Sequence, residues 1–377
     1  MSVADDRWPR TMLMIGGETP WSTRRTAGRS NPRSFNDANG DGEGDFRGII
    51  DKLDYLHDLG VDALWLTPFY PSLLADGGYD VADYCGVDPR FGTLQQFADL
   101  VAGAHERGIR VIIDIVPNYT SDKHPWFTKA LHSAPVWVLG NHDVPRLASR
   151  IGLPKGTDVE HWVTSNGTDP SIDPAQAERR ARADALLMRG LPGTAFIYQG
   201  DELGLPEDLD LQPADLQDPI WERSGHRFKG RDGCRVPLPW NSDSASFGFS
   251  QSGHPWLPQP AWYARYAVSN QERLPGSMLK LYRAAIAARR RWIRLGDEAE
   301  WLADGEYAEY GLGWRVSSGL EVLVNFSSDH AIRLPENATV MLNSRPEITD
   351  CANNQVPPET AVWYFRGTLA ARSKENR

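Results

Sequence analysis

The sequence is poor in cysteine and has no long apolar run. Its three cysteines are Cys85, Cys234 and Cys351, and none belongs to a Cys-x-x-Cys pair. An odd and sparse set of this kind builds neither a disulfide framework nor a zinc site, and it favours a reducing, cytoplasmic environment. No stretch of about 18 consecutive apolar residues is present, so we expect no membrane-spanning helix. The first residues also lack the apolar core of a signal peptide.

The chain has no excess of positive charge. It contains 50 acidic and 40 basic residues, which gives a formal net charge of −10. Nucleic acids bind basic surfaces, so we expect no nucleic-acid partner. Apolar residues make up 41% and charged residues 24% of the 377 positions, as in a globular protein. The 14 tryptophans include candidate stacking surfaces for sugars, although a buried core tryptophan is the commoner case.

From about residue 46 the hydrophobic pattern alternates between helix and strand. Residues 61–67 and 110–116 are apolar or β-branched runs bounded by proline, which is typical of buried strands. Thr93 is placed to cap a helix that lies between them and ends at Gly108. Helix and strand in this alternation predict βα units with a parallel sheet.

The pattern continues and then changes after residue 300. Two more buried strands are predicted over 136–139 and 194–198, with a helix over 174–189 between them. A later helix over 278–290 can be capped by Ser277. Beyond residue 300, apolar residues recur with a period of two, which predicts a small antiparallel β-domain.

The strongest local motif is an acidic loop rich in glycine. Oxygen-bearing side chains recur at every second position: Asp37, Asn39, Asp41, Glu43 and Asp45. Hard cations such as Ca²⁺ are held by ligands of this kind, and the glycines permit the tight turn. An EF-hand requires a bidentate Glu at the twelfth loop position, where this chain has Gly48. The motif therefore predicts a calcium loop of another type, with a plain Asp/Asn/Gly turn as the alternative.

Polar residues also gather where the predicted strands end. They are Asp80, Asp114, Asn118, His142, Asp143, Asp201 and Glu202. In a parallel βα barrel, the catalytic groups lie at the C-terminal ends of the strands. Each residue alone is most simply a polar loop residue that is satisfied locally. Together, at matching strand ends, they favour a functional site.

Several longer segments occur in an order that is typical of one enzyme family. They include PRSFNDANGDGEGD, GVDALWLTPFYPS, GGYDVADY, VIIDIVPNYTSDKHPWF, WVLGNHDVPR, LPGTAFIYQGDELGLP and GRDGCRVPLPW. On these motifs, residues 35–370 resemble the α-amylase superfamily of glycoside hydrolases, in particular its α-glucosidase, oligo-1,6-glucosidase and trehalose synthase branch. The resemblance implies a (β/α)8 TIM barrel followed by a C-terminal antiparallel β-domain, in the α/β fold class.

The resemblance also implies roles for individual residues. It implies that Asp37, Asn39, Asp41 and Asp45, with the carbonyl of Glu43, hold a structural Ca²⁺. It further implies a sugar subsite −1 that accepts an α-glucoside and is lined by Asp80, His142, Asp143 and Arg235. In that site Asp143 stabilises the distorted sugar and His142 bonds its hydroxyls. Asp114 and Asn118 match a signature of the family, but Tyr119 replaces its usual histidine, which weakens one sugar contact.

The two carboxylates that perform the family's chemistry are missing from the sequence. Retaining hydrolysis needs a nucleophile and an acid/base about 5–5.5 Å apart. The family places both on strands between the segments of Asn118 and Asn141, and only 22 residues separate these positions here. One βα unit needs about 30 residues, so we expect strands four to six and the sugar-capping loop domain to be deleted. About four of the eight barrel strands would then remain.

These departures define the expected domain organisation. Residues 1–34 form a poorly ordered segment, 35–295 a truncated (β/α)8 domain, 296–370 the β-domain and 371–377 a tail. A barrel closes in order to remove its sheet edges, so a remnant exposes them. We therefore expect low stability and self-association through the broken barrel edge.

Several functions remain open at this stage. By descent the chain is an α-glucosidase-type hydrolase for short α-glucosides of the maltose and isomaltose class, but a catalytically defective one. Alternatively it is a non-catalytic carbohydrate-binding or regulatory remnant, or a trehalose synthase-like glucosyl isomerase by descent. A working hydrolase that recruits Asp114, Asp201 or Glu202 is disfavoured, because such a pair must face across a formed sugar subsite.

The first strand of the family is not recognisable before Pro32, and we hypothesise that residues 14 to about 31 are translated in a shifted reading frame. With suitable codons, the neighbouring frame of residues 14–24 encodes Asp-Asp-Trp-Trp-Arg-Asp-Ala-Val-Val-Tyr-Gln, which resembles that strand. The gene's nucleotide sequence decides the matter. A neighbouring frame that does not encode this strand would refute the hypothesis.

Overall fold

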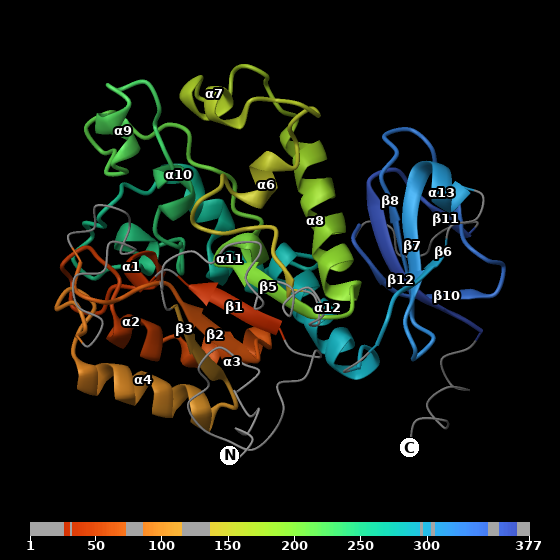
Figure 1. Ribbon diagram of the computed structural model, residues 1–377, viewed down its shortest axis with the longest axis horizontal. Helices are drawn as coiled ribbons and strands as arrows, with labels where there is room; N and C mark the ends of the chain where they lie inside the picture. Colours follow the sequence, from red (N-terminus) through yellow and green to blue (C-terminus); the bar gives the residue numbers. More distant parts are fainter. Residues whose placement is uncertain are drawn as a thin grey trace, which may run out of the picture.

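The chain folds around two five-stranded sheets, one parallel and one antiparallel (Figure 1). The computed structural model describes residues 26–30, 32–72, 86–114, 136–294, 297–302, 306–345 and 354–367. None of the helices within these ranges is both long enough and apolar enough to cross a membrane. The strands of the parallel sheet lie within residues 26–198, and those of the antiparallel sheet lie within residues 300–366.

The parallel sheet consists of β1 (Thr26–Ser30), β2 (Ala63–Leu66), β3 (Arg110–Ile113), β4 (Val136–Trp137) and β5 (Thr194–Tyr198). Its order is β3-β2-β1-β5-β4, and all neighbours are parallel. Of these five strands, β5 comes last in the chain, yet it lies beside β1, which comes first. The first and last strands are neighbours in this way when a barrel closes on itself. Among the described residues this sheet does not close, because β3 and β4 are its edges.

Strand β1 corrects two expectations. The sequence predicts four parallel strands and a poorly ordered segment over 1–34, but Thr26–Ser30 is the central, fifth strand. Ala27 is in register with Ala63 of β2 on one side and with Phe196 of β5 on the other. The local sequence has a low strand propensity, but β1 forms hydrogen bonds with β2 on one side and with β5 on the other. This pairing outweighs the local propensity, because N–H and C=O groups between two strands need partners.

The long helices match the sequence patterns. They are α3 (Leu53–Leu59), α4 (Leu94–Glu106), α8 (Pro174–Gly190) and α12 (Met278–Trp292). Thr93 and Gln96 form a capping box at the start of α4, and Asp173 and Ser277 cap α8 and α12 with their side chains. The predicted helix starts are therefore confirmed, because these side chains satisfy backbone N–H groups that the first turn leaves unpaired.

Short helical segments connect these elements around the sheet. They are α1 (Pro32–Phe35), α2 (Phe46–Ile50), α6 (Leu147–Arg150), α7 (Val159–Thr164), η1 (Asp201–Leu203), α9 (Ile220–Arg223), α10 (Asp232–Arg235), η2 (Ala245–Gly248), η3 (Ala261–Tyr266) and α11 (Val268–Arg273). Figure 1 shows α6, α7, α9 and α10 on the same side of the parallel sheet.

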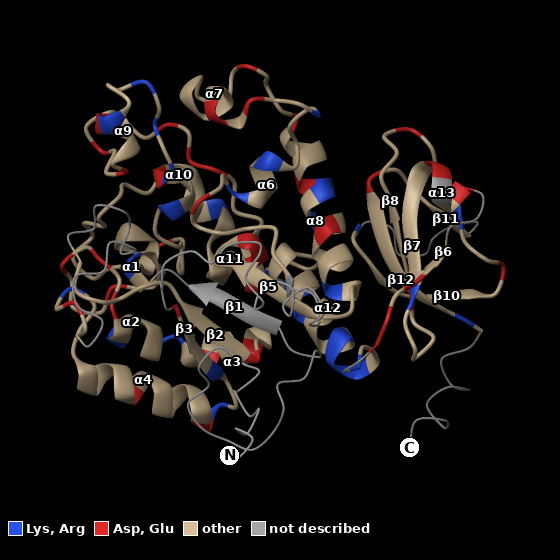
Figure 2. Ribbon diagram, in the orientation of Figure 1, with Lys and Arg blue, Asp and Glu red and all other residues tan. Residues whose placement is uncertain are grey.

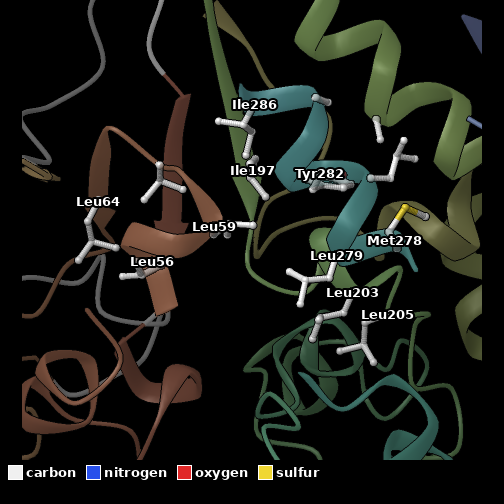
Figure 3. Packing of buried hydrophobic residues seen from close by; sticks show 14 of the residues in the cluster. Leu56, Leu59, Leu64, Ile197, Leu203, Leu205, Met278, Leu279, Tyr282 and Ile286 are labelled. Atoms are coloured by element: carbon white, nitrogen blue, oxygen red, sulfur yellow. The ribbon is translucent and has the colours of Figure 1, made fainter. Parts of the chain in front are cut away.

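The main core lies between the parallel sheet and the helices that cover it. Figure 3 shows Leu56 and Leu59 of α3 across from Ile197 of β5, with Leu279 and Ile286 of α12 on the other side. All five side chains are buried. Complete burial of such a side chain stabilises the fold by about 1.5–3 kcal/mol, so this layer holds α3 and α12 on the sheet.

The C-terminal domain is the predicted antiparallel sheet. It has the order β10-β12-β8-β7-β6, with a separate pair of β9 and β11. The strands are β6 (Glu300–Leu302), β7 (Gly311–Arg315), β8 (Glu321–Asn325), β9 (Ile332–Arg333), β10 (Ala338–Asn343), β11 (Gln355–Val356) and β12 (Thr360–Arg366), and α13 (Glu306–Tyr310) precedes β7. The short β6 and β11 are too brief to give a period-two signal.

The β-domain is attached to the barrel domain through α8. The indole N–H groups of Trp314 and Trp363 donate to the carbonyls of Gly190 and Leu186, at 2.9 and 3.1 Å. A Cβ on Gly190 would lie 2.8 Å from Val322 and 3.1 Å from Trp314, so glycine is required for this close approach. The domain interface thus fixes the helix that leads directly into β5.

Candidate functional site

Asp143 is the centre of a charged cluster in the loop that follows β4. One of its oxygens, Oδ1, lies 3.0 Å from Nη1 of Arg231, 3.5 Å from Nη2 of Arg235 and 3.4 Å from Nε2 of His142. Its side chain is 43% exposed, whereas those of His142 and Arg235 are 3% and 6% exposed. The structure therefore brings three predicted site residues together, with Asp143 facing outward and the other two behind it.

The two buried residues position the loop that carries Asp143. Nε of Arg235 donates to the backbone carbonyl of His142 at 3.0 Å, which ties α10 to the loop after β4. The sequence analysis implies that His142 bonds sugar hydroxyls, but its burial gives it a supporting role in this arrangement. Arg235 likewise reaches Asp143 from within the protein.

The remaining predicted residues lie elsewhere. Asp80 and Asn118, with Tyr119, fall outside the described residues. Asp114 is half-buried just after β3, where its backbone N–H donates to the carbonyl of Leu66 at 3.2 Å.

Asp201 and Glu202 belong to the framework of the barrel domain. Oδ2 of Asp201 accepts the backbone N–H of Tyr198 at 3.1 Å. Glu202 accepts the Tyr55 hydroxyl and the Gly200 N–H, both at 2.8 Å. Both carboxyls are buried, and neither lines the cavity described below. Their geometry gives no support to a hydrolase that recruits them as catalytic groups.

Arg231 and Asp218 are site residues that the sequence analysis misses. Nε of Arg231 donates to Oδ2 of Asp218 at 2.6 Å, while its Nη1 donates to Asp143. Burial alone raises the pKa of Asp218, but the hydrogen bond from Arg231 and the charge of Arg235 outweigh it, so the net pKa lies below the usual value. The segment GRDGCR contains both arginines, so the signal was present in the sequence.

A cavity of about 500 Å³ opens beside Asp143. Its charged lining residues are Asp143, Glu160, Asp218, Arg223, Lys229 and Arg231. Its aliphatic lining residues are Val144, Pro145, Val159, Val163 and Ile220. Figure 2 shows both acidic and basic residues on α9, which contributes Ile220 and Arg223 to the lining. The volume is that of an ordinary small-molecule site.

Buried hydrogen bonds of Arg146 and Glu207 connect two loops of this domain. The backbone N–H of Arg146 donates to Oε2 of Glu207 at 2.7 Å, and its guanidinium donates to the carbonyls of Gln199 and Val236. Both side chains are buried, and burial raises the pKa of Glu207 to about 8 although the Arg146 N–H opposes the shift. These bonds join the loop after β4 to the loop after β5.

The acidic loop over 37–45 is organised by its own backbone. Asp37 accepts the N–H groups of Gly40 and Gly42 at 2.7 and 2.9 Å. Oδ1 of Asp41 accepts the Glu43 N–H at 2.8 Å, and Asn39 bonds the other Asp41 oxygen. Oxygens that accept one N–H retain a second lone pair, so their chemistry fits a hard cation.

Two members of the loop have other partners. Oδ1 of Asp45 accepts the Gly48 N–H at 2.7 Å and caps α2, while its Oδ2 accepts two further backbone N–H groups. Oε1 of Glu43 pairs with Arg33 at 2.7 Å, which directs the carboxylate toward that arginine. Across the described ranges, no three His, Cys, Asp or Glu side chains are grouped as metal ligands.

The comparisons with known proteins identify the family. The model of the α-amylase catalytic domain matches residues 31–136 and, as a separate segment, residues 132–296. The chain therefore belongs to the α-amylase family of glycoside hydrolases. This confirms the resemblance inferred from the sequence motifs.

Curated relatives place the chain in the trehalose-metabolising and α-glucosidase branch. It is 56% identical to the trehalose synthase of Pimelobacter sp. over 127 residues, which are 34% of this chain and 21% of that protein. It is 52% identical to the trehalose-6-phosphate hydrolase of Escherichia coli over 120 residues, 30% and 22% of the two chains. The matched segments thus span about a fifth of these relatives.

A longer alignment joins the chain to a probable α-glucosidase of Rhizobium meliloti, with 44% identity over an aligned length of 446. This alignment covers 69% of this chain and 80% of the relative. Because the whole chain has only 377 residues, a large part of that aligned length has no counterpart here.

The fold is that of solved enzymes of the same group. The isomaltulose synthase SmuA of Protaminobacter rubrum superposes with a TM-score of 0.66 at 20% identity, covering 92% of this chain and 99% of that one. The trehalose-6-phosphate hydrolase of Bacillus licheniformis gives a TM-score of 0.64 at 19% identity, covering 92% and 99%. At this identity the likeness establishes the fold alone.

We predict that Glu207→Gln removes a pH-dependent loss of stability. The folded protein holds the Glu207 proton up to about pH 8, whereas the unfolded chain releases it near pH 4.5. The unfolded state therefore binds fewer protons within this window, and the contribution of Glu207 to stability falls as pH rises through it. Between about pH 5 and pH 8, the Tm of the wild-type protein should fall by several degrees relative to that of the variant.

The exposed Glu222→Gln serves as the matched control for the same thermal melts. Its Tm should follow that of the wild-type protein at every pH. If the Tm of the wild type and that of Glu207→Gln changed with pH in parallel, the Glu207 proton would make no contribution to the pH dependence of stability.

Proposed function

We propose that this chain is a remnant of an α-glucosidase-type hydrolase that binds a short α-glucoside at Asp143 and does not hydrolyse it. The observation that carries the proposal is the cluster of His142, Asp143, Arg231 and Arg235 beside a cavity of about 500 Å³. Oδ1 of Asp143 receives the contacts of Arg231, Arg235 and His142, so Oδ2 is the oxygen available to accept a sugar hydroxyl. A carboxylate held in this way is preorganised to bind without rearrangement.

The absence of hydrolysis follows from the carboxyl groups around the cavity. Hydrolysis with retention needs one carboxylate as nucleophile and one carboxyl that is protonated at working pH. Asp218 has a lowered pKa and is held by Arg231, so it cannot donate a proton near neutral pH. Glu160 also lines the cavity, but it is exposed to solvent at the start of α7 and is not enclosed in a buried pocket.

An internal deletion accounts for the missing pair. The family model matches in two segments that meet at residues 132–136, immediately before β4. The sheet order β3-β2-β1-β5-β4 is what remains of a barrel when the strands between the third and the seventh are removed. Strands β3 and β4 are then the two edges on either side of the deletion.

Descent from a trehalose synthase-like glucosyl isomerase is the second candidate. It is supported by the 56% identity to a trehalose synthase over 127 residues. Hydrolysis and isomerisation of a glucoside place the same kind of sugar in subsite −1, so the proposed ligand is a short α-glucoside under either ancestry. A cytoplasmic location, which rests on the low cysteine content, belongs to the same proposal.

We predict that maltose or isomaltose binds to the purified protein in calorimetry and that p-nitrophenyl α-glucoside is not turned over. Asp143→Asn should weaken sugar binding by about tenfold or more, because a charge-assisted hydrogen bond becomes a neutral one. The exposed Glu222→Gln on α9 should bind as the wild type does. Turnover that Asp143→Asn abolishes would overturn the proposal in favour of an active hydrolase.

We also propose that the loop over 37–45 binds a structural Ca²⁺ through Asp37, Asn39, Asp41, Asp45 and the Glu43 carbonyl. Hard oxygen donors at every second position support this, and Ca²⁺ takes six to eight such ligands. The hydrogen bonds that Asp45 accepts leave its oxygens less available than those of Asp37 and Asp41. The ion would replace water at the loop and would have no part in bond cleavage.

Calcium should raise the Tm of the protein by several degrees, and a chelator should reverse the increase, because a ligand that binds only the folded state stabilises it. Asp41→Asn should reduce the Ca²⁺-dependent shift, since Asp41 is exposed and contributes little to the fold by itself. Mg²⁺, which requires a smaller octahedral site, serves as the control. An unchanged Tm in saturating Ca²⁺ would refute calcium binding.

Self-association through β3 and β4, the edges of the parallel sheet within the described residues, forms the last part of the proposal. Unpaired strand edges recruit strands of other copies, and lysine at an edge prevents this. Light scattering should show a dimer or larger species and loss of monomer on mild heating, and Val138→Lys next to β4 should restore monomer. Leu274→Lys, which is also exposed but remote from the sheet edges, is the control. A monomer with a sharp melt at high temperature would contradict self-association.

A further inference from the structure

Glu359 lies in the turn before β12 and reaches from the β-domain to α8. Its φ is 54°, in the left-handed region that glycine favours and that other residues seldom adopt. Only 4% of its side chain is exposed. Oε1 accepts hydrogen bonds from Gln176 at 2.6 Å and from Nε of Arg180 at 2.9 Å, and Oε2 accepts one from Nε of Arg179 at 3.0 Å. A buried carboxylate in a strained turn, with three side-chain donors from one helix, anchors that helix to the β-domain.

Arg180 continues this contact beyond α8. Its Nη1 donates to the carbonyl of Ile151, the residue that ends α6, at 3.3 Å. The same end of α6 is packed closely on α8, because a Cβ on Gly152 would lie 2.8 Å from the Cβ of Ala177. The guanidinium of Arg180 therefore connects the carboxylate of the β-domain to the end of α6.

Helix α6 in turn holds the loop that carries Asp143. Nη2 of Arg150, in the last turn of α6, donates to the carbonyl of Leu139 at the beginning of that loop. At the other end of α6, the backbone N–H of Arg146 donates to Oε2 of Glu207 at 2.7 Å. Asp143 lies in the chain between Leu139 and Arg146, so its position depends on that of α6.

We propose that Glu359 is a positioning residue for Asp143, and that Arg180 carries its effect to α6. The proposal rests on the proposed function, because the carboxylate that it positions is the one that binds the sugar. The β-domain then contributes to binding, although no lining residue of the cavity within the described part of the chain comes from it. Without the link, α6 and its loop open more often, so the arrangement that binds the sugar is populated less and the apparent affinity falls.

Arg179 and Arg180 offer a matched pair of variants. They are neighbours in α8, they pair with the same carboxylate, and their side chains are 33% and 31% exposed. Among the described residues, Arg179 has Glu359 as its hydrogen-bond partner, whereas Arg180 bonds both Glu359 and Ile151. Arg179→Met and Arg180→Met each remove ion pairing with Glu359 and keep an apolar stem, so the Tm of both variants should fall by similar amounts.

The first measurement is calorimetry of the full chain with methyl α-D-glucopyranoside. Arg180→Met should weaken binding by about threefold to tenfold, as mutations along a line of coupled contacts do, and Arg179→Met should leave it unchanged. Glu359→Gln should weaken binding as Arg180→Met does. The double variant of Glu359→Gln and Arg180→Met should bind no more weakly than either single variant, because both act through one link.

Hydrogen exchange provides a measurement that needs no sugar. The backbone N–H groups of residues 149–151 form hydrogen bonds within α6, so they exchange when this helix opens. Arg180→Met and Glu359→Gln should raise their exchange rates several-fold above those of Arg179→Met. The amides of α4, which Figure 1 shows away from α8, should exchange as they do in the wild type.

The results separate the positioning role from the proposed function. Weaker binding and faster exchange in Arg180→Met and Glu359→Gln, but not in Arg179→Met, would support the positioning role. Equal effects in Arg179→Met would assign them to the general loss of an ion pair and overturn it. If the wild type binds the glucoside and Arg180→Met binds it equally well, only the positioning role is overturned. If the wild type binds no glucoside, both are overturned.

Discussion

The fold depends on the hydrogen bonding of β1 to strands on both of its sides. Strands β2 and β3 come from the first part of the chain, and β4 and β5 come from the part after the deletion proposed above. Only β1 joins these halves into one sheet, because Ala27 is paired with Ala63 and with Phe196. The residues of the site all belong to the later half, which contributes only β4 and β5 to the sheet. Pairing with β1 therefore determines whether these two strands are part of a larger sheet.

At the site itself, charge is balanced by three arginines, of which Arg146 and Arg235 are buried and Arg231 is half-buried. Arg235 supports Asp143 from inside, Arg231 bridges it to Asp218, and Arg146 joins the loops beneath. A buried charge that loses its partner destabilises a protein strongly, so these residues are constrained together and not one by one. This constraint explains how the loops around Asp143 hold a defined pocket.

Much of the fold could be predicted from local signals, and the rest depends on contacts between distant residues. Thr93, Asp173 and Ser277 cap the helices whose starts they predict, and residues 194–198 form the expected strand. Thr26–Ser30 carries no such signal, because its neighbours on both sides impose its conformation. The bridge from Arg231 to Asp143 joins residues 88 positions apart, so the segment GRDGCR supplies the arginine but does not reveal its partner. Asp80 and Asn118 lie outside the described residues and stay predictions.

Gly190 sets how closely the two domains approach each other. Trp314 and Trp363 both rest against it, and the space left for a side chain is smaller than a methyl group. Any side chain at residue 190 would therefore push the β-domain away from α8, and the register between the two sheets of the molecule would be lost with it.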